Sequence, residues 1–194
     1  MKIIPGENNM PQDLHDDAEL TVVLPLFNES EQILEAISRI ISTLDGLQYK
    51  LILVDDGSTD NSVSLISNLQ LPQLHVISYS QNKGKGYALK QGISSISSEY
   101  GAYIDTDLDI DPSSLLIGLN LLKQNPNLTM AIGSKVHKDS IVQYSQTRKI
   151  LSKTYRLLTT ILFHLSVNDT QTGLKVFRSK EVKNSLVQVS ANGW

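Results

Sequence analysis

The residues best suited to chemistry lie in one acidic stretch, residues 101–112, where a short apolar run is followed by Asp105, Asp107, Asp109 and Asp111 at alternating positions. In an extended backbone, side chains two residues apart share a face, so Asp105, Asp107 and Asp109 are predicted to crowd together at a strand end. Three carboxylates at close range repel one another unless a cation offsets the repulsion. Because carboxylates are hard oxygen ligands, we expect that cation to be Mg²⁺ or Mn²⁺.

Asp111 has a structural explanation of its own. An Asp that is followed by Pro112 and then by an apolar stretch up to residue 122 is typical of the N-cap and first position of a helix. The predicted metal ligands are therefore Asp105, Asp107 and Asp109.

Two further polar motifs follow predicted strands. Asp55 and Asp56 come directly after an apolar run. Acids at such a place accept hydrogen bonds from a base or a ribose in dinucleotide-binding folds, although an Asp-Gly-Ser sequence also makes a simple turn. In residues 82–86, glycines at a helix start let backbone N–H groups approach an anion, and Lys83 or Lys85 adds positive charge. A turn with solvated lysines explains this motif equally, and the Gly-Lys-Ser/Thr ending of a Walker loop is missing.

Apolar runs and amphipathic stretches alternate along the chain. The runs at 20–25, 51–54, 74–79, 100–104 and 129–132 are typical of strands buried on both faces of a parallel sheet. The stretches after the first four predict helices, and in the first of them Asn28 and Glu31 have the form of a capping box. We therefore predict an α/β fold with a mostly parallel central sheet and helices on both faces. Ligands of such sheets bind beyond the carboxyl ends of the strands, where every motif above lies.

Composition narrows the class of protein. A chain of 194 residues predicts one domain with a sizeable core, and the formal charge of −3 without a lysine-rich block argues against a nucleic-acid partner. The absence of cysteine excludes a disulfide framework, a thiol nucleophile and a Cys-ligated zinc site, and it fits a reducing compartment. Residues 1–19 are predicted to be a polar N-terminal arm. A helix predicted over 144–164 is too short in its apolar part to span a bilayer, and it suits both packing on the sheet and lying on a membrane surface.

Five motifs follow one another along the chain. They are Pro25-x-x-Asn28-Glu29, Asp55-Asp56-Gly57-Ser58-x-Asp60, Asn82-x-Gly84-Lys85-Gly86, the pair Asp105 and Asp107, and Asp169-Thr-Gln-Thr-Gly173-x-Lys175. This ordered set resembles the family 2 glycosyltransferases of the GT-A fold, which is Rossmann-like. Residues 20–194 carry the resemblance and would form the catalytic domain. The resemblance is strongest to the polyprenyl-phosphate branch, which includes dolichyl-phosphate glucose and mannose synthases, and the last motif leans toward the glucose synthases.

The resemblance implies roles for these residues. Asp107 would act in catalysis, and the metal would be held by Asp105 and Asp107, with Asp109. Lys135 and Arg148 would receive the acceptor phosphate, with Lys135 standing where relatives often have arginine and therefore lacking a planar fork. The nucleotide-sugar would be bound by Pro25, Asn28, Glu29, Asp55, Asp56, Lys85 and Asp105.

The reaction implied is a metal-dependent, inverting transfer of a hexose from a UDP-glucose-like or GDP-mannose-like donor to a polyprenyl phosphate at a membrane surface. The protein would then be cytoplasmic or peripheral at the cytoplasmic membrane face, without a transmembrane segment in this chain. Relatives usually continue past the segment that ends at Trp194, so we expect the catalytic domain to be truncated at its C-terminus.

Two rival classes fit the residues less well. A sugar nucleotidyltransferase would carry a Gly-rich, Arg-containing loop after the first strand, and a receiver-like domain would carry its acid pair there; neither feature is found. Two alternatives stay open: a sugar-nucleotide-binding remnant without turnover, and a family 2 glycosyltransferase with a different acceptor.

Overall fold

The computed structural model describes residues 3–5, 17–133 and 172–186. Its strands are β1 (Ile3–Pro5), β2 (Leu20–Leu26), β3 (Tyr49–Asp55), β4 (Leu74–Ser78), β5 (Tyr100–Ile104), β6 (Met130–Ile132) and β7 (Leu174–Arg178). Its helices are α1 (Ile33–Thr43), α2 (Ser62–Ser67), α3 (Lys85–Ser94), α4 (Ser113–Gln124) and α6 (Ser179–Leu186).

The described strands form one sheet in the order β1-β4-β3-β2-β5-β7-β6. The first five of these run parallel, whereas β7 is antiparallel to both of its neighbours. The prediction of a mostly parallel sheet is confirmed. The predicted polar arm, however, contains a strand that the sequence analysis did not anticipate, because β1 pairs with β4 in the register Ile3 to Val76.

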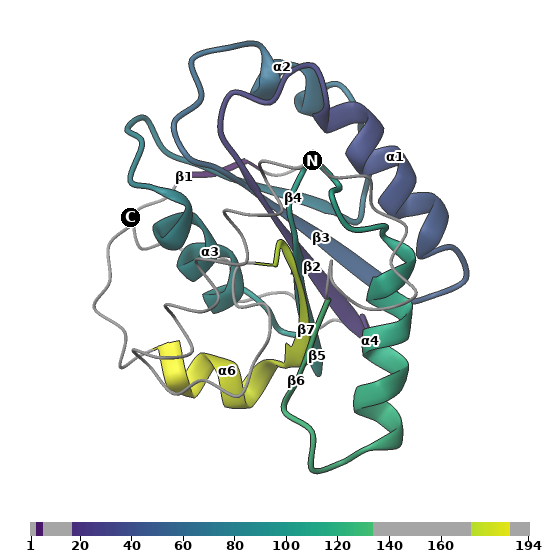
Figure 1. Cartoon of the computed structure of the whole chain (residues 1–194). Helices are drawn as coiled ribbons and strands as arrows, with labels where there is room; N and C mark the ends of the chain where they lie inside the picture. Colours follow the sequence, from purple (N-terminus) through teal and green to yellow (C-terminus); the bar gives the residue numbers. More distant parts are fainter. Residues whose placement is uncertain (1–2, 6–16, 134–171, 187–194) are drawn as a thin grey trace, which may run out of the picture.

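Helices cover both faces of the sheet (Figure 1). Along β2, Leu20, Val22 and Leu24 pack in a core with α1, α2 and α4, whereas Val23 packs in a second core with α3 and α6. Because successive side chains of a strand point to opposite faces, a strand that is buried on both faces must be apolar at nearly every position. This is why the sequence of β2 reads as a continuous apolar run, and the predicted two-sided fold is confirmed.

The start of α1 differs from its prediction. The helix begins at Ile33, and Asn28 lies outside it with a positive φ of 54°. Asn tolerates this left-handed conformation better than most residues. Its side-chain oxygen accepts a hydrogen bond from the Thr59 N–H at 2.8 Å, so Asn28 ties two loops together. The predicted capping box between Asn28 and Glu31 is therefore wrong.

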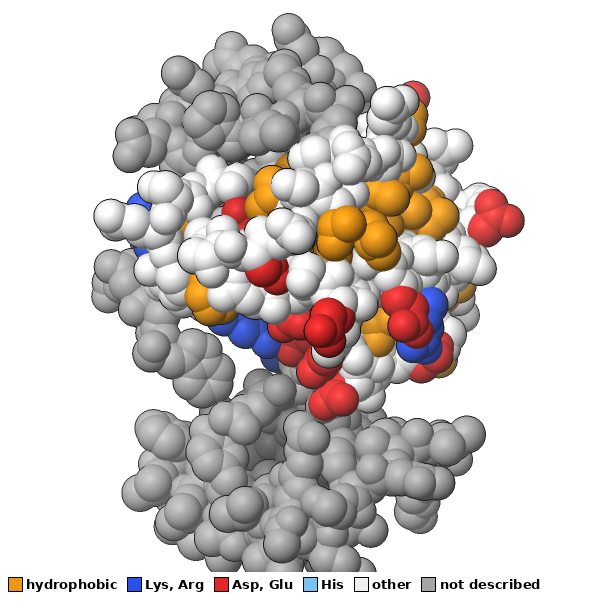
Figure 2. All heavy atoms as spheres, turned by 90° about the horizontal axis from the view of Figure 1, so that it is seen from above, with side chains coloured by type: hydrophobic (Ala, Val, Ile, Leu, Met, Phe, Trp, Pro, Cys, Tyr) orange, Lys and Arg blue, Asp and Glu red, His pale blue; other side chains and the backbone are white. Residues whose placement is uncertain are grey.

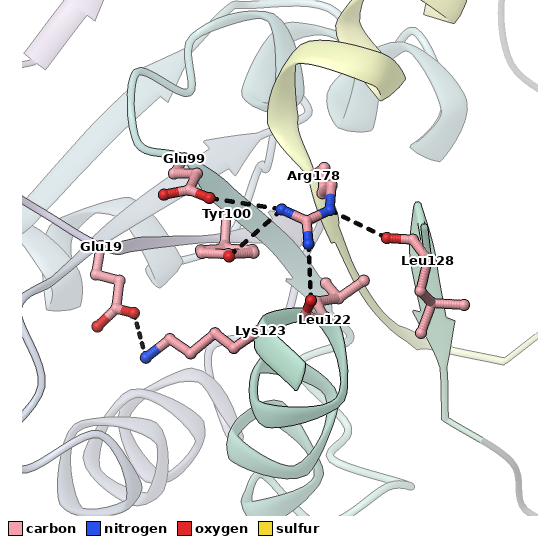
Figure 3. A network of polar contacts seen from close by, with 7 residues as sticks. All are labelled: Glu19, Glu99, Tyr100, Leu122, Lys123, Leu128 and Arg178. Carbon is pink, nitrogen blue, oxygen red and sulfur yellow. Dashed lines mark hydrogen bonds and ion pairs between the residues drawn. The ribbon is translucent and has the colours of Figure 1, made fainter. Parts of the chain in front are cut away.

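Arg178, the last residue of β7, makes several polar contacts near the start of β5 (Figure 3). Its guanidinium donates to the carbonyls of Leu122 at 2.7 Å and Leu128 at 3.1 Å, and it lies over the Tyr100 ring. Nearby, Lys123 of α4 pairs with Glu19, just before β2. These contacts fix α4 against β5 and β7, and so fix where the acidic turn before α4 can lie.

The long helix predicted over 144–164 falls outside the described residues, as do Lys135 and Arg148. In the described part of the chain, no helix combines the length and the apolar character that crossing a bilayer requires.

Candidate functional site

A cleft of about 450 Å³ opens where β2, β3 and β5 end, and we refer to it as the strand-end cleft. Parallel strands bring their carboxyl ends to one edge of the sheet, and the loops that follow enclose a space there. The residues that line the cleft are Pro25, Leu26, Phe27, Glu29, Asp56, Asn82, Gly84, Lys85, Ala88, Asp105, Thr106 and Asp107.

Most of the predicted site residues meet at this cleft. Six of them line it: Pro25, Glu29, Asp56, Lys85, Asp105 and Asp107. Three others, Asn28, Asp55 and Asp109, are not among its lining residues. In the structure, Asn28 and Asp55 form hydrogen bonds to neighbouring loops and strands. Their direct contact with a nucleotide stays a prediction.

The loop after β2 is tied to the loop after β3 by a row of hydrogen bonds. The Asp56 N–H donates to the Leu26 carbonyl at 2.8 Å, and the Asn28 N–H donates to Ser58 Oγ at 3.0 Å. Further along, the Ser30 N–H donates to Asp60 Oδ2 at 3.1 Å. These bonds set the position of Glu29 at the cleft.

Asp55 and Asp56 both connect elements, but only Asp56 reaches the cleft. Asp55 is buried and accepts hydrogen bonds from the Ser58 N–H at 3.0 Å and from Ser78 Oγ at 2.7 Å. Asp56 accepts the N–H groups of Lys83 at 2.8 Å and Gly84 at 2.9 Å, at the start of α3. The two acids thus do more than make a turn, because they also anchor β4 and the loop that follows it, while a role in nucleotide binding stays a prediction.

Gly57 permits this connection. Its φ is +72°, and a Cβ placed on it would lie 2.7 Å from the backbone nitrogen of Asn82. A side chain at this position would meet both backbone strain and a backbone clash. The Asp-Gly sequence is thus required for the close approach of the loops after β3 and β4.

The acidic stretch is not extended, so the prediction that three of its carboxylates share a strand face is wrong. β5 ends at Ile104, and the chain then turns: the Leu108 N–H donates to the Asp105 carbonyl at 3.2 Å, and Leu108 has a φ of 47°. Asp105 and Asp107 line the cleft, whereas Asp109 is exposed and its N–H donates to Asp107 Oδ1. Asp111 accepts the Ser113 N–H at 2.9 Å just before α4, but the N-cap is Pro112 and the helix begins at Ser113, one residue later than predicted.

Asp105 is held in the cleft by its backbone and by one of its two carboxylate oxygens. Its N–H donates to the Gly173 carbonyl at 2.8 Å, and its Oδ2 accepts a hydrogen bond from Lys85 Nζ at 2.6 Å. Its Oδ1 is buried and finds no hydrogen-bond partner among the described residues. The carboxylate is therefore under-satisfied, and an additional cation at its other oxygen, Oδ2, would stabilise it.

The electrostatics of the cleft favour a cation. Its lining carries four carboxylates and one lysine. Burial raises the pKa of Glu29, and the carboxylates of Asp107, Asp60 and Asp105 raise it further, against an opposing effect of Lys85. In the space-filling view, acidic side chains gather on one face of the molecule beside basic ones (Figure 2).

A divalent metal fits this donor set only in part. Among residues 3–5, 17–133 and 172–186, no three His, Cys, Asp or Glu side chains are grouped so that they could hold a metal. Asp105 and Asp107 supply two carboxylates at the cleft, and Mg²⁺ is commonly bound by one or two carboxylates together with substrate phosphates. The expected three-carboxylate site is thus not formed, whereas a site completed by a diphosphate suits Asp105 and Asp107.

The sequence analysis assigned no role to two residues in or beside the cleft, Phe27 and Gly173. Phe27 lines it with a ring that is 44% exposed, which is unusual for a large aromatic side chain directly after a buried strand. Gly173 packs against Asp105, and a Cβ on it would lie 2.3 Å from Asp105 Oδ2. The exposed ring had no periodicity to mark it, and the contact of Gly173 depends on the pairing of β5 with β7.

Comparison with known proteins identifies the family. The model of Glycosyl transferase family 2 matches residues 21–184 of the chain. The chain belongs to Glycosyl transferase family 2. The resemblance drawn from its five motifs is therefore confirmed, and the strand-end cleft of this family 2 member lies within the matched residues.

Curated relatives align with most of the length of this family 2 member. The dolichyl-phosphate beta-glucosyltransferase of Saccharomyces cerevisiae is 30% identical over 203 residues, covering 92% of this chain and 61% of the yeast protein. The enzyme of the same name from Homo sapiens is 30% identical over 193 residues, covering 91% of this chain and 60% of the human protein. The chain thus spans about three fifths of the length of these relatives.

Solved structures share its fold. Glucosyl-3-phosphoglycerate synthase from Mycobacterium tuberculosis, in complex with Mn²⁺, UDP and phosphoglyceric acid, superposes with a TM-score of 0.63 at 22% identity, covering 84% of this chain and 57% of that one. The same enzyme in complex with Mg²⁺ and UDP gives a TM-score of 0.61 at 21% identity. At this level of identity the likeness concerns the fold alone.

Proposed function

We propose that this family 2 member transfers a glucosyl residue from a UDP-glucose-like nucleotide-sugar to a polyprenyl phosphate, with inversion at the anomeric carbon. The observation that carries the proposal is the convergence of Glu29, Asp56, Lys85, Asp105 and Asp107 on one cleft at the carboxyl ends of the strands. The names of the curated relatives support the sugar and the class of acceptor.

In this proposal Asp105 and Asp107 hold Mg²⁺ or Mn²⁺ together with the diphosphate of the donor. The metal would offset the charge that develops on the nucleoside diphosphate as it leaves. Lys85 begins α3, where the helix N-terminus and its own ammonium favour an anion. The diphosphate would therefore lie between the acidic turn and the start of α3.

The exposed ring of Phe27 would stack on the nucleobase. A planar apolar surface in an otherwise polar cleft is a suitable platform for a base, and base–aromatic stacking contributes about 1–3 kcal/mol. Phe27→Ala is expected to weaken UDP binding accordingly. Leu34→Ala is the matched control, because Leu34 is also an exposed apolar residue but does not line the cleft.

The transfer itself needs an acceptor oxygen aimed at the anomeric carbon. A phosphate monoester is largely a dianion at pH 7, because its second pKa is about 6, so it needs cations to orient it rather than a base to deprotonate it. Its oxygen forms the new bond to the anomeric carbon while the bond from that carbon to the nucleoside diphosphate breaks, and the leaving oxygen keeps the electron pair. Lys135 and Arg148 are the predicted cations for the acceptor phosphate.

Two measurements test the proposal. Thermal unfolding is followed with UDP-glucose and Mn²⁺, together and singly, on the wild type and on Asp107→Ala. At about 100 times the Kd, binding would raise the Tm of the wild type by about 5–10 °C, and Asp107→Ala would remove the metal-dependent part of the rise. Absence of any metal-dependent stabilisation by UDP-glucose would contradict the donor site.

Transfer of labelled glucose from UDP-glucose to a short polyprenyl phosphate then tests the reaction. Lys135→Ala and Arg148→Ala are expected to lose transfer while keeping the donor-dependent rise in Tm. Stabilisation by donor and metal without transfer to any polyprenyl phosphate would instead favour a binding remnant or a different acceptor.

A further inference from the structure

The ammonium of Lys85 sits directly on a carboxylate that the proposed function assigns to a metal. Lys85 Nζ lies 2.6 Å from Asp105 Oδ2. The two side chains come from different elements, the start of α3 and the turn after β5. A cation is therefore already present where a second cation is expected to bind.

A metal ion cannot approach Asp105 through its other oxygen, Oδ1. The Asp105 side chain is 23% exposed, yet its Oδ1 is almost fully shielded from solvent. The exposed part of the carboxylate group is thus on the side of Oδ2, which Lys85 occupies. A metal that arrives from the cleft must meet Oδ2 and hence must displace the lysine.

Asp105 itself is not free to move aside. Its N–H is bonded to the Gly173 carbonyl at 2.8 Å, and the Cα of Gly173 backs its carboxylate so closely that a Cβ there would lie 2.3 Å from Oδ2. Lys85, in contrast, is 43% exposed and has a long, flexible side chain. When a metal binds, the part that moves is the lysine.

A displaced Lys85 needs a new anionic partner. The other lining residues that carry charge are the acids Glu29, Asp56 and Asp107, and Asp56 is already committed to two backbone N–H groups beside Lys85. A diphosphate at the start of α3 would supply both a partner for Lys85 and further oxygen ligands for the metal.

We propose that Lys85 is an internal counter-ion that competes with the divalent metal for Asp105, so that metal and nucleotide bind cooperatively to this site. Without nucleotide, the metal must break the Lys85–Asp105 ion pair and leave the ammonium without a partner. With nucleotide, the diphosphate takes the ammonium and Asp105 is released. This inference rests on the donor site of the proposed function and specifies the order in which its charges are exchanged.

Binding of Mn²⁺ tests the inference without any measurement of turnover. Electron paramagnetic resonance counts free Mn²⁺ during titration of the protein, with and without UDP. Because a partly exposed ion pair is only weakly stabilising, Lys85→Met is expected to bind Mn²⁺ alone about two- to fivefold more tightly than the wild type. The factor by which UDP raises the affinity for Mn²⁺ is expected to be smaller in Lys85→Met than in the wild type. In the variant, UDP no longer has to draw an ammonium away from Asp105, so the coupling between the two ligands is reduced.

Three variants control the comparison. Lys90→Met removes the same charge from α3 at a residue that does not line the cleft, and its Mn²⁺ affinity should equal that of the wild type. Lys85→Arg keeps the charge and should retain the weak Mn²⁺ binding of the wild type without UDP. Lys85→Gln repeats the test with a neutral polar side chain, and circular dichroism checks that each variant is folded.

The outcomes separate this inference from the proposed function. If neither Lys85→Met nor Lys85→Gln binds Mn²⁺ more tightly than the wild type, the competition does not exist, while the donor site stands. If the wild type binds no Mn²⁺ even with UDP, the metal site of the proposed function is itself wrong.

Discussion

Replacement of Gly173 by alanine tests whether the position of Asp105 depends on the absence of a side chain directly before β7. A Cβ on Gly173 would lie 2.3 Å from Asp105 Oδ2, 2.7 Å from its Cγ and 3.1 Å from its Cβ. Ordinary contact begins at 3.4 Å, so the carboxylate would have to shift by roughly 1 Å. Such overpacking costs about 1–3 kcal/mol of unfolding free energy.

The same shift would disturb the ligand site. Moving Oδ2 by about 1 Å breaks the ion pair with Lys85 and misplaces the proposed metal ligand, and a misplacement of this size reduces catalytic rates by about 100-fold. We therefore expect Gly173→Ala to lower both the free energy of unfolding and the affinity for Mn²⁺ with UDP. Urea denaturation followed by circular dichroism measures the first, and titration with Mn²⁺ measures the second.

A double-mutant cycle shows whether Asp105 is the cause. In an Asp105→Ala background the two closest atoms, Oδ2 and Cγ, are gone, and only the contact at 3.1 Å remains. The cost of Gly173→Ala should then fall by about 1–2 kcal/mol, because neighbours in contact are not additive. If the two substitutions add to within about 0.5 kcal/mol, the steric reasoning about Gly173 is wrong.

Three further predictions concern stability. Asp56→Ala leaves two backbone N–H groups at the start of α3 without their acceptor. In urea denaturation this is expected to cost about 2–3 kcal/mol of unfolding free energy, and the variant should also bind UDP more weakly. Arg178→Met removes the donors for two carbonyls at the end of the sheet away from the cleft, so the Tm should fall by about 5–10 °C. The Kd for UDP, measured by calorimetry, should stay unchanged. A higher Kd would mean that the two ends of the sheet are coupled. Burial raises the pKa of Asp60, but hydrogen bonds from Ser62 and Ser30 outweigh this effect and lower the pKa from 3.8 to about 2. The ionised form of Asp60 therefore stabilises the fold above about pH 4, and this stabilisation is lost as the pH falls toward 2. The stability difference between the wild type and Asp60→Asn should therefore narrow over that range, and a constant difference would count against the assigned hydrogen bonds.

Much of the fold was predictable because its strands are buried on both faces. A continuous apolar run such as Leu20–Leu26 leaves few alternatives to a central parallel strand, and β5 was predicted at its observed bounds. β1 was missed because three residues carry too little periodicity, and its pairing with β4 is decided by a distant strand. The start of α1 was misplaced because Asn28 uses its side chain for a neighbouring loop rather than for its own helix.

The location of the candidate site was predictable, but the arrangement of its side chains was not. Parallel strands carry Asp56, Asp105 and Asp107 to one edge of the sheet, so their common location was predictable. Their meeting at one cleft also needs β3 and β5 to flank β2, which the sheet order decides. Which oxygen of Asp105 is available does not follow, because that depends on Lys85 and on Gly173. The separation of Asp109 from the cleft was likewise hidden, since the alternating acids suggested an extended chain where the backbone turns.

The sequence by itself determined the alternating strands and helices between residues 20 and 132, the edge of the sheet at which polar residues collect, and the family, because each of these depends on local periodicity or on motifs contiguous in the chain. Only the tertiary structure decided that Asn28 and Asp55 hold loops, that Phe27 faces the cleft and that Lys85 covers Asp105. These contacts join residues that are about 20 or more positions apart, and their geometry is set by strand offsets and turns that no local pattern encodes.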